Sequence, residues 1–172
     1  IMSPPRVAPD GSIYLQTFGY SQGFEFVVHH LLADGTHQSF SLDFENYVDN
    51  STFDSKGNIY LWNWEKLSIL SPSGKKIREC KNNSHDQIAS ELLTVSNNIL
   101  VYATEEGKII AKNTDCSIFW TSSVESDGKH DIQYQLIYDE NNTLYVGGPG
   151  GVLYAFNVND GKQLWKSDPA SE

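Results

Sequence analysis

Long apolar runs and positive charge are both scarce in this sequence of 172 residues. No stretch approaches the ~18 consecutive apolar residues of a membrane-spanning helix, so we expect no such helix. Lysine and arginine total 12 against 22 acidic residues, which gives a net charge of −10, and no basic run is longer than Lys75-Lys76. Such a chain would be repelled by nucleic acid and by anionic membranes, whereas a basic protein partner stays open.

Cysteine is nearly absent as well, since the chain has only Cys80 and Cys116. These residues form either one disulfide or two free buried thiols, and the sequence favours neither. No segment has the pattern of a signal peptide, so we interpret the chain, which does not begin with Met, as a mature or trimmed form. Three N-x-S/T sequons fall in predicted turns or loops: Asn50, Asn82 and Asn141. They favour N-glycosylation and a location in the secretory-pathway lumen or outside the cell.

The sequence is instead rich in short β-branched and aromatic runs, separated by clusters of Asn, Asp, Gly and Pro. The clearest unit extends from Leu136 to Asp168 and contains four such runs joined by three clusters. Residues in these clusters tolerate positive φ or hydrogen-bond to their own backbone, which is typical of hairpin turns. The unit therefore predicts a four-stranded antiparallel sheet.

Two landmarks of this unit recur along the chain. A turn leads into an apolar and aromatic run at four places: Pro9-Asp10-Gly11, Asp54-Ser55-Lys56-Gly57, Asn97-Asn98 and Asn141-Asn142. A second turn precedes the last strand of each unit, at Asp34-Gly35, Ser73-Gly74, Asp115-Cys116 and Asp160-Gly161. The spacing of about 41–46 residues is that of four-stranded propeller blades.

One stretch resembles a known repeat. Residues Ala155 to Trp165 (AFNVNDGKQLW) are similar to the A-x-D-x-x-T-G-K-x-x-W motif of pyrroloquinoline-quinone-type β-propeller repeats. In that family the tryptophan docks on the neighbouring blade, which implies a structural docking role for Trp165 and for Trp120, the equivalent residue one unit earlier. A docking tryptophan buries roughly 150–250 Å². The alternative role for these rings is a ligand platform.

The resemblance and the repeats predict an all-β, β-propeller-type fold over residues 1–172, as a single domain. The predicted fold has four four-stranded antiparallel blades, at about 3–43, 47–80, 89–122 and 132–168. All four strands of each blade come from one continuous segment of the chain. Propellers of this family usually have seven or eight blades. The chain is therefore half of a larger ring, a dimerising half or a small closed ring, and we favour the first two. Open sheet edges would invite self-association.

The catalytic features of quinoprotein dehydrogenases are missing. The resemblance implies a quinone, a calcium ion held by carboxylate and amide oxygens, an aspartate base and often a disulfide between adjacent cysteines. The acids in the predicted turns lack the spacing of a calcium loop, and we interpret them as solvated turn formers: Asp10, Asp54, Asp139 and Glu140. We expect no enzyme activity, no cofactor and no metal site.

Histidine offers one further candidate for metal binding. His29 and His30 are neighbours on a predicted strand, so they point to opposite faces and cannot easily ligate one metal together. His37 could approach one of them across the following hairpin. We expect these side chains to be surface or half-buried strand histidines.

The turns between the second and third strands of blades one and two carry the candidate partner site. This turn lies on the usual binding face of propellers, and in blade two it holds two tryptophans at i and i+2, on one side of the strand. The candidate residues of these two turns are Phe18, Tyr20, Phe24, Trp62, Asn63, Trp64 and Glu65, and the segment between the two blades adds Phe44 and Tyr47. They form either an exposed apolar patch or a cap on the core.

The sequence leaves three hypotheses about function: protein binding, carbohydrate binding and catalysis. We expect a non-catalytic module that binds a protein or itself in the secretory or extracellular space. Similar repeats occur in lumenal sensor domains of endoplasmic-reticulum stress kinases and in a bacterial outer-membrane assembly lipoprotein, which bind without catalysis. The alternative is a carbohydrate-binding lectin that stacks sugars on Trp62, Trp64 and Tyr20 beside Asn63 and Glu65. A fragment of a quinoprotein dehydrogenase is the third.

Overall fold

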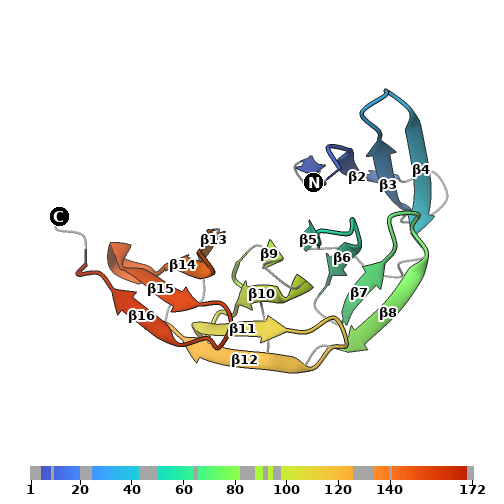
Figure 1. Ribbon diagram of the computed structural model, residues 1–172. Helices are drawn as coiled ribbons and strands as arrows, with labels where there is room; N and C mark the ends of the chain where they lie inside the picture. The colour runs from blue at the N-terminus through green and yellow to red at the C-terminus, as the bar shows by residue number, and fades with distance from the viewer. Residues whose placement is uncertain are drawn as a thin grey trace. The chain divides into compact units, whose positions relative to one another are not determined.

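The computed structural model describes residues 5–8, 10–19, 25–42, 50–63, 66–81, 88–90, 93–94, 98–125, 134–139 and 141–169. In these residues it has four antiparallel four-stranded sheets, and a short 3₁₀ helix, η2 (Pro149–Gly151), lies between two strands of the last sheet (Figure 1). The all-β fold with four four-stranded antiparallel sheets, predicted from the repeats, is confirmed. Within the described residues, no helix is long and apolar enough to cross a membrane.

Every sheet is built from four strands that are consecutive in the sequence. The first sheet contains β1 (Arg6–Val7), β2 (Ile13–Gly19), β3 (Glu25–Leu31) and β4 (His37–Leu42). The second contains β5 (Asn50–Phe53), β6 (Ile59–Trp62), β7 (Lys66–Leu70) and β8 (Lys76–Lys81). The third contains β9 (Leu93–Thr94), β10 (Leu100–Ala103), β11 (Lys108–Lys112) and β12 (Ile118–Ser123). The fourth contains β13 (Gln135–Tyr138), β14 (Thr143–Gly147), β15 (Leu153–Asn157) and β16 (Gln163–Lys166).

The repeated turn positions share one backbone conformation. Eight residues, one between the first and second strands and one between the third and fourth strands of each sheet, have φ between +59° and +84°: Gly11, Gly35, Gly57, Gly74, Asn98, Cys116, Asn142 and Gly161. Glycine and asparagine adopt this left-handed region most easily, which explains their recurrence at these points of the sequence. Cys116 is the exception, because it has a side chain that normally avoids positive φ.

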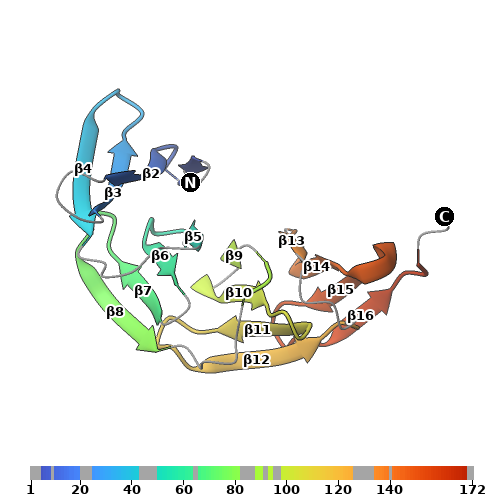
Figure 2. The same ribbon diagram turned by 180° about the vertical axis from the view of Figure 1, so that it is seen from behind.

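The chain divides into two compact units, residues 1–81 and 82–172, each holding two sheets. In the first unit, Tyr14 and Val28 of the first sheet pack against Ile59, Leu61 and Leu70 of the second. In the second unit, one face of the third sheet packs against one face of the fourth, with Val101, Ala111, Trp120, Leu144, Val146, Tyr154 and Phe156 in the core. Figure 2 shows the four strands of each sheet side by side from behind. The predicted single-domain boundary stays a prediction.

Two details of the sequence interpretation are wrong. Asn50 is the first residue of β5 and does not lie in a loop. Asp54 is a turn former but is not solvated, because it is 2% exposed. Its carboxylate accepts hydrogen bonds from the backbone N–H groups of Lys56 and Asn58 at 2.9 Å each and from the Tyr60 hydroxyl at 3.1 Å. Burial, and then the charge of Asp54, raise the pKa of Tyr60.

Asp10 and Asp139 repeat this turn chemistry in more accessible positions. Asp10 Oδ1 accepts hydrogen bonds from the backbone N–H and the hydroxyl of Ser12, at 2.9 and 2.6 Å. Asp139 accepts from the backbone N–H groups of Asn141 and Thr143, at 2.9 Å each, and from the Tyr145 hydroxyl at 3.1 Å. The backbone hydrogen bond from Thr143, followed by the other contacts, lowers the pKa of Asp139. These aspartates are therefore committed to their own turns. Glu140 lies outside the described residues.

Candidate functional site

The β6–β7 hairpin carries the part of the candidate partner site that the structure describes. Asn63 and Lys66 close this hairpin with two backbone hydrogen bonds, Asn63 N–H to the Lys66 carbonyl at 3.0 Å and the reverse at 3.2 Å. The Asn63 side chain adds a third, because its Oδ1 accepts from the Lys66 N–H at 2.8 Å. Only residues 64 and 65 lie between them in the sequence. The base of the loop is thus fixed in a tight two-residue connection.

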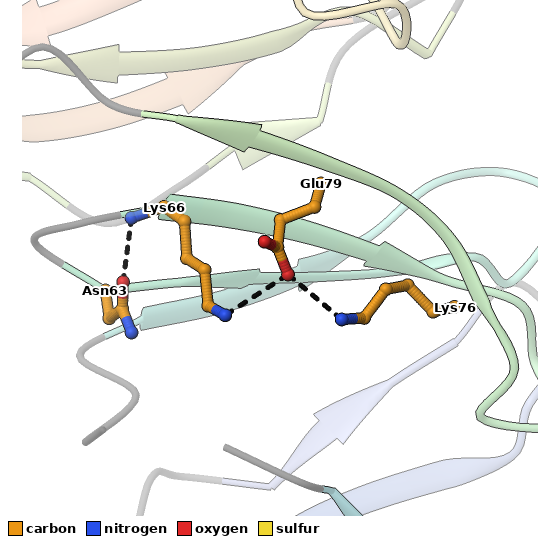
Figure 3. Close-up of polar contacts among 4 residues, drawn as sticks. All are labelled: Asn63, Lys66, Lys76 and Glu79. Atoms are coloured by element: carbon orange, nitrogen blue, oxygen red, sulfur yellow. Dashed lines mark hydrogen bonds and ion pairs between the residues drawn. The ribbon is translucent and has the colours of Figure 1, made fainter. Parts of the chain in front are cut away.

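A second set of contacts holds the same hairpin from the side (Figure 3). The ammonium groups of Lys66 and Lys76 both contact Glu79 Oε2, at 3.2 and 3.0 Å. The hydrogen bonds from Lys76 and then Lys66 lower the pKa of Glu79. Each pair is partly exposed, so each contributes only about 0–1 kcal/mol to stability. Their effect is to orient Lys66, whose backbone also closes the hairpin.

The structure describes only part of the predicted aromatic set. Trp62 is 2% exposed and Asn63 is fully buried, so for these two residues the core alternative is the one observed. Phe18 lies on β2, where it pairs with Phe26 of β3. The other six candidates lie outside the described residues: Tyr20, Phe24, Phe44, Tyr47, Trp64 and Glu65. An exposed patch that includes the Trp62 ring is therefore excluded, and the rest of the patch stays a prediction.

The histidines follow the strand alternation expected of them. His30 is buried and stacks on Tyr14, with ring centroids 4.1 Å apart, whereas His29 lies on the opposite face. His29 Nδ1 is 3.1 Å from Nε2 of His37, and its Nε2 is 2.8 Å from the Thr17 hydroxyl. His37 thus reaches one member of the pair across the hairpin. Within the described residues, no third His, Cys, Asp or Glu joins them in a metal-binding group.

Trp120 docks on the next sheet as the repeat pattern predicts. Its indole N–H donates a 2.6 Å hydrogen bond to the Val158 carbonyl, and its ring is 7% exposed. The ring lies so close to Gly161 that a methyl group on this residue would be 2.6 Å from ring atom Cε3. Two residues further on, the Ser122 hydroxyl donates to the Gly161 carbonyl. The Val158 and Gly161 carbonyls were not predicted as acceptors from the sequence, although the repeated turns mark their position.

Trp165 is placed differently from Trp120. It lies on β16 and its side chain is 44% exposed, with its ring 5.9 Å from that of Tyr145 on its own sheet. Among the residues that the structure describes, no other sheet covers it. The docking contact predicted for Trp165 is therefore not made with any described sheet.

Both cysteines are disulfide-bonded, so the disulfide alternative is correct and the free-thiol alternative is wrong. Cys80 is a buried residue near the end of β8, and Cys116 occupies the left-handed turn before β12. Disulfides persist in oxidising compartments and are rare in the cytosol of most cells. Of the predicted sequons, Asn141 lies in the turn between β13 and β14 with an exposed side chain, whereas Asn82 lies outside the described residues.

Comparison with known proteins supports the repeat assignment. No curated protein matches the sequence. Among solved structures, a protein of unknown function from Bacteroides caccae aligns with a TM-score of 0.66 and 14% identity. The alignment covers 96% of this chain and 66% of that one, so the chain spans about two thirds of this neighbour, and the likeness shows the fold.

The family is shown by a direct sequence match. The model of a pyrroloquinoline-quinone-type repeat family, described as outer membrane protein assembly factor BamB, matches residues 63–172. This range includes the Trp120 and Trp165 motifs and the turns at Cys116 and Gly161. With its left-handed turns and its docked tryptophan, the chain belongs to this PQQ-type, BamB-like repeat family.

Proposed function

We propose that this chain is a non-catalytic protein-interaction module of the secretory or extracellular space. The observation that carries the proposal is the fixed base of the β6–β7 hairpin, where Asn63 and Lys66 hold a two-residue connection. The sequence places Trp64 and Glu65 in that connection. A large ring on a rigid scaffold is a common anchor in protein interfaces, because little conformational entropy is lost on binding.

The family and the disulfide support the other parts of the proposal. The family is described as an assembly factor, a role in which a protein acts by binding other proteins. The disulfide-bonded cysteines suit an oxidising compartment, in keeping with secretion. The burial of Trp62 removes one of the three rings that a lectin site would use for stacking sugars, so protein binding is favoured over carbohydrate binding.

Site-specific photo-cross-linking tests the binding surface. A photoreactive phenylalanine at position 64 is compared with one at position 119, because Phe119 is an exposed aromatic residue on β12 outside the candidate site. We expect position 64 to give a discrete protein adduct that excess unlabelled wild-type chain suppresses and excess Trp64→Ala chain does not. Equal adducts at both positions, or competition by Trp64→Ala, would contradict the proposed site.

Two further assays test the class of function. Binding to a glycan array that is lost in Trp64→Ala, without any protein adduct, would assign the site to carbohydrate. Dye-linked alcohol oxidation, measured after addition of pyrroloquinoline quinone and calcium, is expected to stay at the background rate. Turnover above background would contradict the non-catalytic assignment.

A further inference from the structure

The fourth sheet has one covered face and one exposed face. Leu144, Val146, Tyr154 and Phe156 point into the core shared with the third sheet. Residues that alternate with these point the other way, and three of them are largely exposed: Ile137 (65%), Leu153 (40%) and Trp165 (44%). We call this set, with Tyr145, the β16 face. Apolar side chains gathered on one exposed face are typical of a contact surface.

The contact of Trp120 with Gly161 indicates which kind of surface would fit Trp165 on the β16 face. Trp120 and Ser122 lie four and six residues after Cys116, the left-handed residue of their own turn, and both contact the Gly161 turn of the next sheet. Trp165 and Ser167 lie four and six residues after Gly161. The fourth sheet therefore repeats both residues at the same spacing, although the Ser167 hydroxyl donates to the Asp168 carbonyl and accepts from the Leu153 N–H. The structural complement of the β16 face is a turn with a left-handed glycine.

The first sheet offers such a turn. Gly35 precedes β4 with φ of +84°, and Asp34 Oδ1 accepts from the Thr36 N–H at 2.8 Å. The Gly161 turn has φ of +70° and the same contact, from the Lys162 N–H to Asp160 Oδ1 at 3.0 Å. Unlike Gly161, Gly35 is open, because no described atom lies within 4 Å of where a methyl group would be. No described side chain packs on the turn at Gly35 in the way that Trp120 packs on the turn at Gly161.

The sheet that carries Gly35 also exposes a neutral apolar face. The first sheet packs Tyr14 and Val28 against the second sheet, and its opposite face exposes Val7 (70%), Ile13 (40%) and Leu31 (39%). The residues of β3 and β4 that continue this face on the two strands between positions 27 and 41 include no Asp, Glu, Lys or Arg: Val27, His29, His37, Ser39 and Ser41. We call this set, with Gly35, the β4 face. The four residues of the β16 face are likewise uncharged, and the Tyr145 hydroxyl among them donates to the Asp139 carboxylate at 3.1 Å. In a chain with a net charge of −10, both faces are thus mainly apolar, and one carboxylate lies beside each of them, Asp139 and Asp34.

We propose that the β16 face of one copy binds the β4 face of a second copy, with the Trp165 indole over Gly35. The contact copies the one that Trp120 makes with Gly161, although the receptor turn is one residue shorter. The contact is heterologous, because one copy contributes its β16 face and the other its β4 face. Two such contacts close a dimer if a two-fold rotation relates the two copies. The inference rests on the proposed role in protein interaction, with a second copy as the partner, and is independent of the Trp64 site.

Sedimentation velocity with paired variants tests this contact. We expect the wild-type chain to sediment at twice 19.3 kDa or more, and Trp165→Ala and Gly35→Asn each to sediment as monomers. Losing a central tryptophan should weaken association about tenfold or more. Phe119→Ala and Gly150→Asn are the matched controls and should leave association unchanged, because Phe119 lies off both faces and Gly150 is a left-handed glycine with open surroundings.

Mixing the variants gives the sharpest result. Trp165→Ala keeps an intact Gly35 turn and Gly35→Asn keeps an intact Trp165, so an equimolar mixture should recover one contact and form a heterodimer. A wild-type monomer up to about 0.1 mM, where a micromolar contact would be populated, overturns the proposal. So does self-association that persists in both variants or a mixture that stays monomeric. Far-UV circular dichroism identifies any variant that fails to fold, in which case Trp165→Phe and Gly35→Ser replace the pair.

Discussion

Gly161 cannot acquire a side chain without disturbing Trp120. Gly161→Ala combines a left-handed backbone with a methyl group 2.6 Å from the docked indole, so we expect it to lower the free energy of unfolding by about 2–4 kcal/mol. Gly150→Ala is the control, because Gly150 has φ of +67° and no neighbour within 4 Å, and it should cost only about 1 kcal/mol. Urea unfolding monitored by tryptophan fluorescence measures both. Equal losses would mean that the Trp120 contact contributes nothing.

Asp54 and Asp10 each accept hydrogen bonds within the turn before the second strand of a sheet, but they differ in burial. Asp54→Ala leaves the buried Tyr60 hydroxyl and two backbone N–H groups without their acceptor, and we expect a loss of about 2–4 kcal/mol. Asp10→Ala should cost clearly less, because Asp10 is exposed to water that can replace its contacts. Thermal unfolding of the two variants checks the order. A larger loss for Asp10→Ala would contradict the importance of burial.

At the scale of the strands, most of the architecture could be predicted because turns and repeats are local. The residues that need positive φ are visible as Gly or Asn, and hairpins connect neighbours in the sequence. Burial was harder to predict, because the alternation of residues assigns Trp62 to a side of its strand but does not say whether that side is covered. Asp54 shows the same limit, since a turn motif is identical in water and in a core. For Trp165 the motif is present, but no other described sheet covers the ring.

Disulfide bonding of both cysteines adds a covalent constraint to the chain. In an intrachain bridge between residues 80 and 116, the chain-entropy account gives a stabilisation of about 3–4 kcal/mol. Reduction of the wild-type chain should lower the urea midpoint accordingly. The Cys80→Ala, Cys116→Ala double variant should start at the lower midpoint and show no response to the reductant. A response in the double variant would show that the reductant acts elsewhere.

For the whole molecule, four carboxylates make stability depend on acid pH. The pKa values of Asp10, Asp34, Glu79 and Asp139 are lowered, chiefly by hydrogen bonds from Ser12, from Thr36, from Lys76 and from Thr143, respectively. A folded-state pKa below the unfolded value means that the stabilisation is complete above the unfolded pKa and is lost as pH falls through the folded one. We therefore expect stability to fall below about pH 4.

Urea midpoints at pH values of about 6, 4 and 3 measure this dependence. Asp139→Asn removes one of the four groups and should reduce the loss between the two lower values. An unchanged pH profile in this variant would show that Asp139 is not one of the groups responsible.

The consecutive order of strands within each sheet has a consequence for how the chain folds. Every ladder joins strands that are neighbours in the sequence, so no sheet has to wait for a distant segment. The contacts within each sheet are therefore local in the sequence, and local contacts favour fast folding. Each sheet can form as soon as its own segment leaves the ribosome, and the later step is the docking of finished sheets on one another.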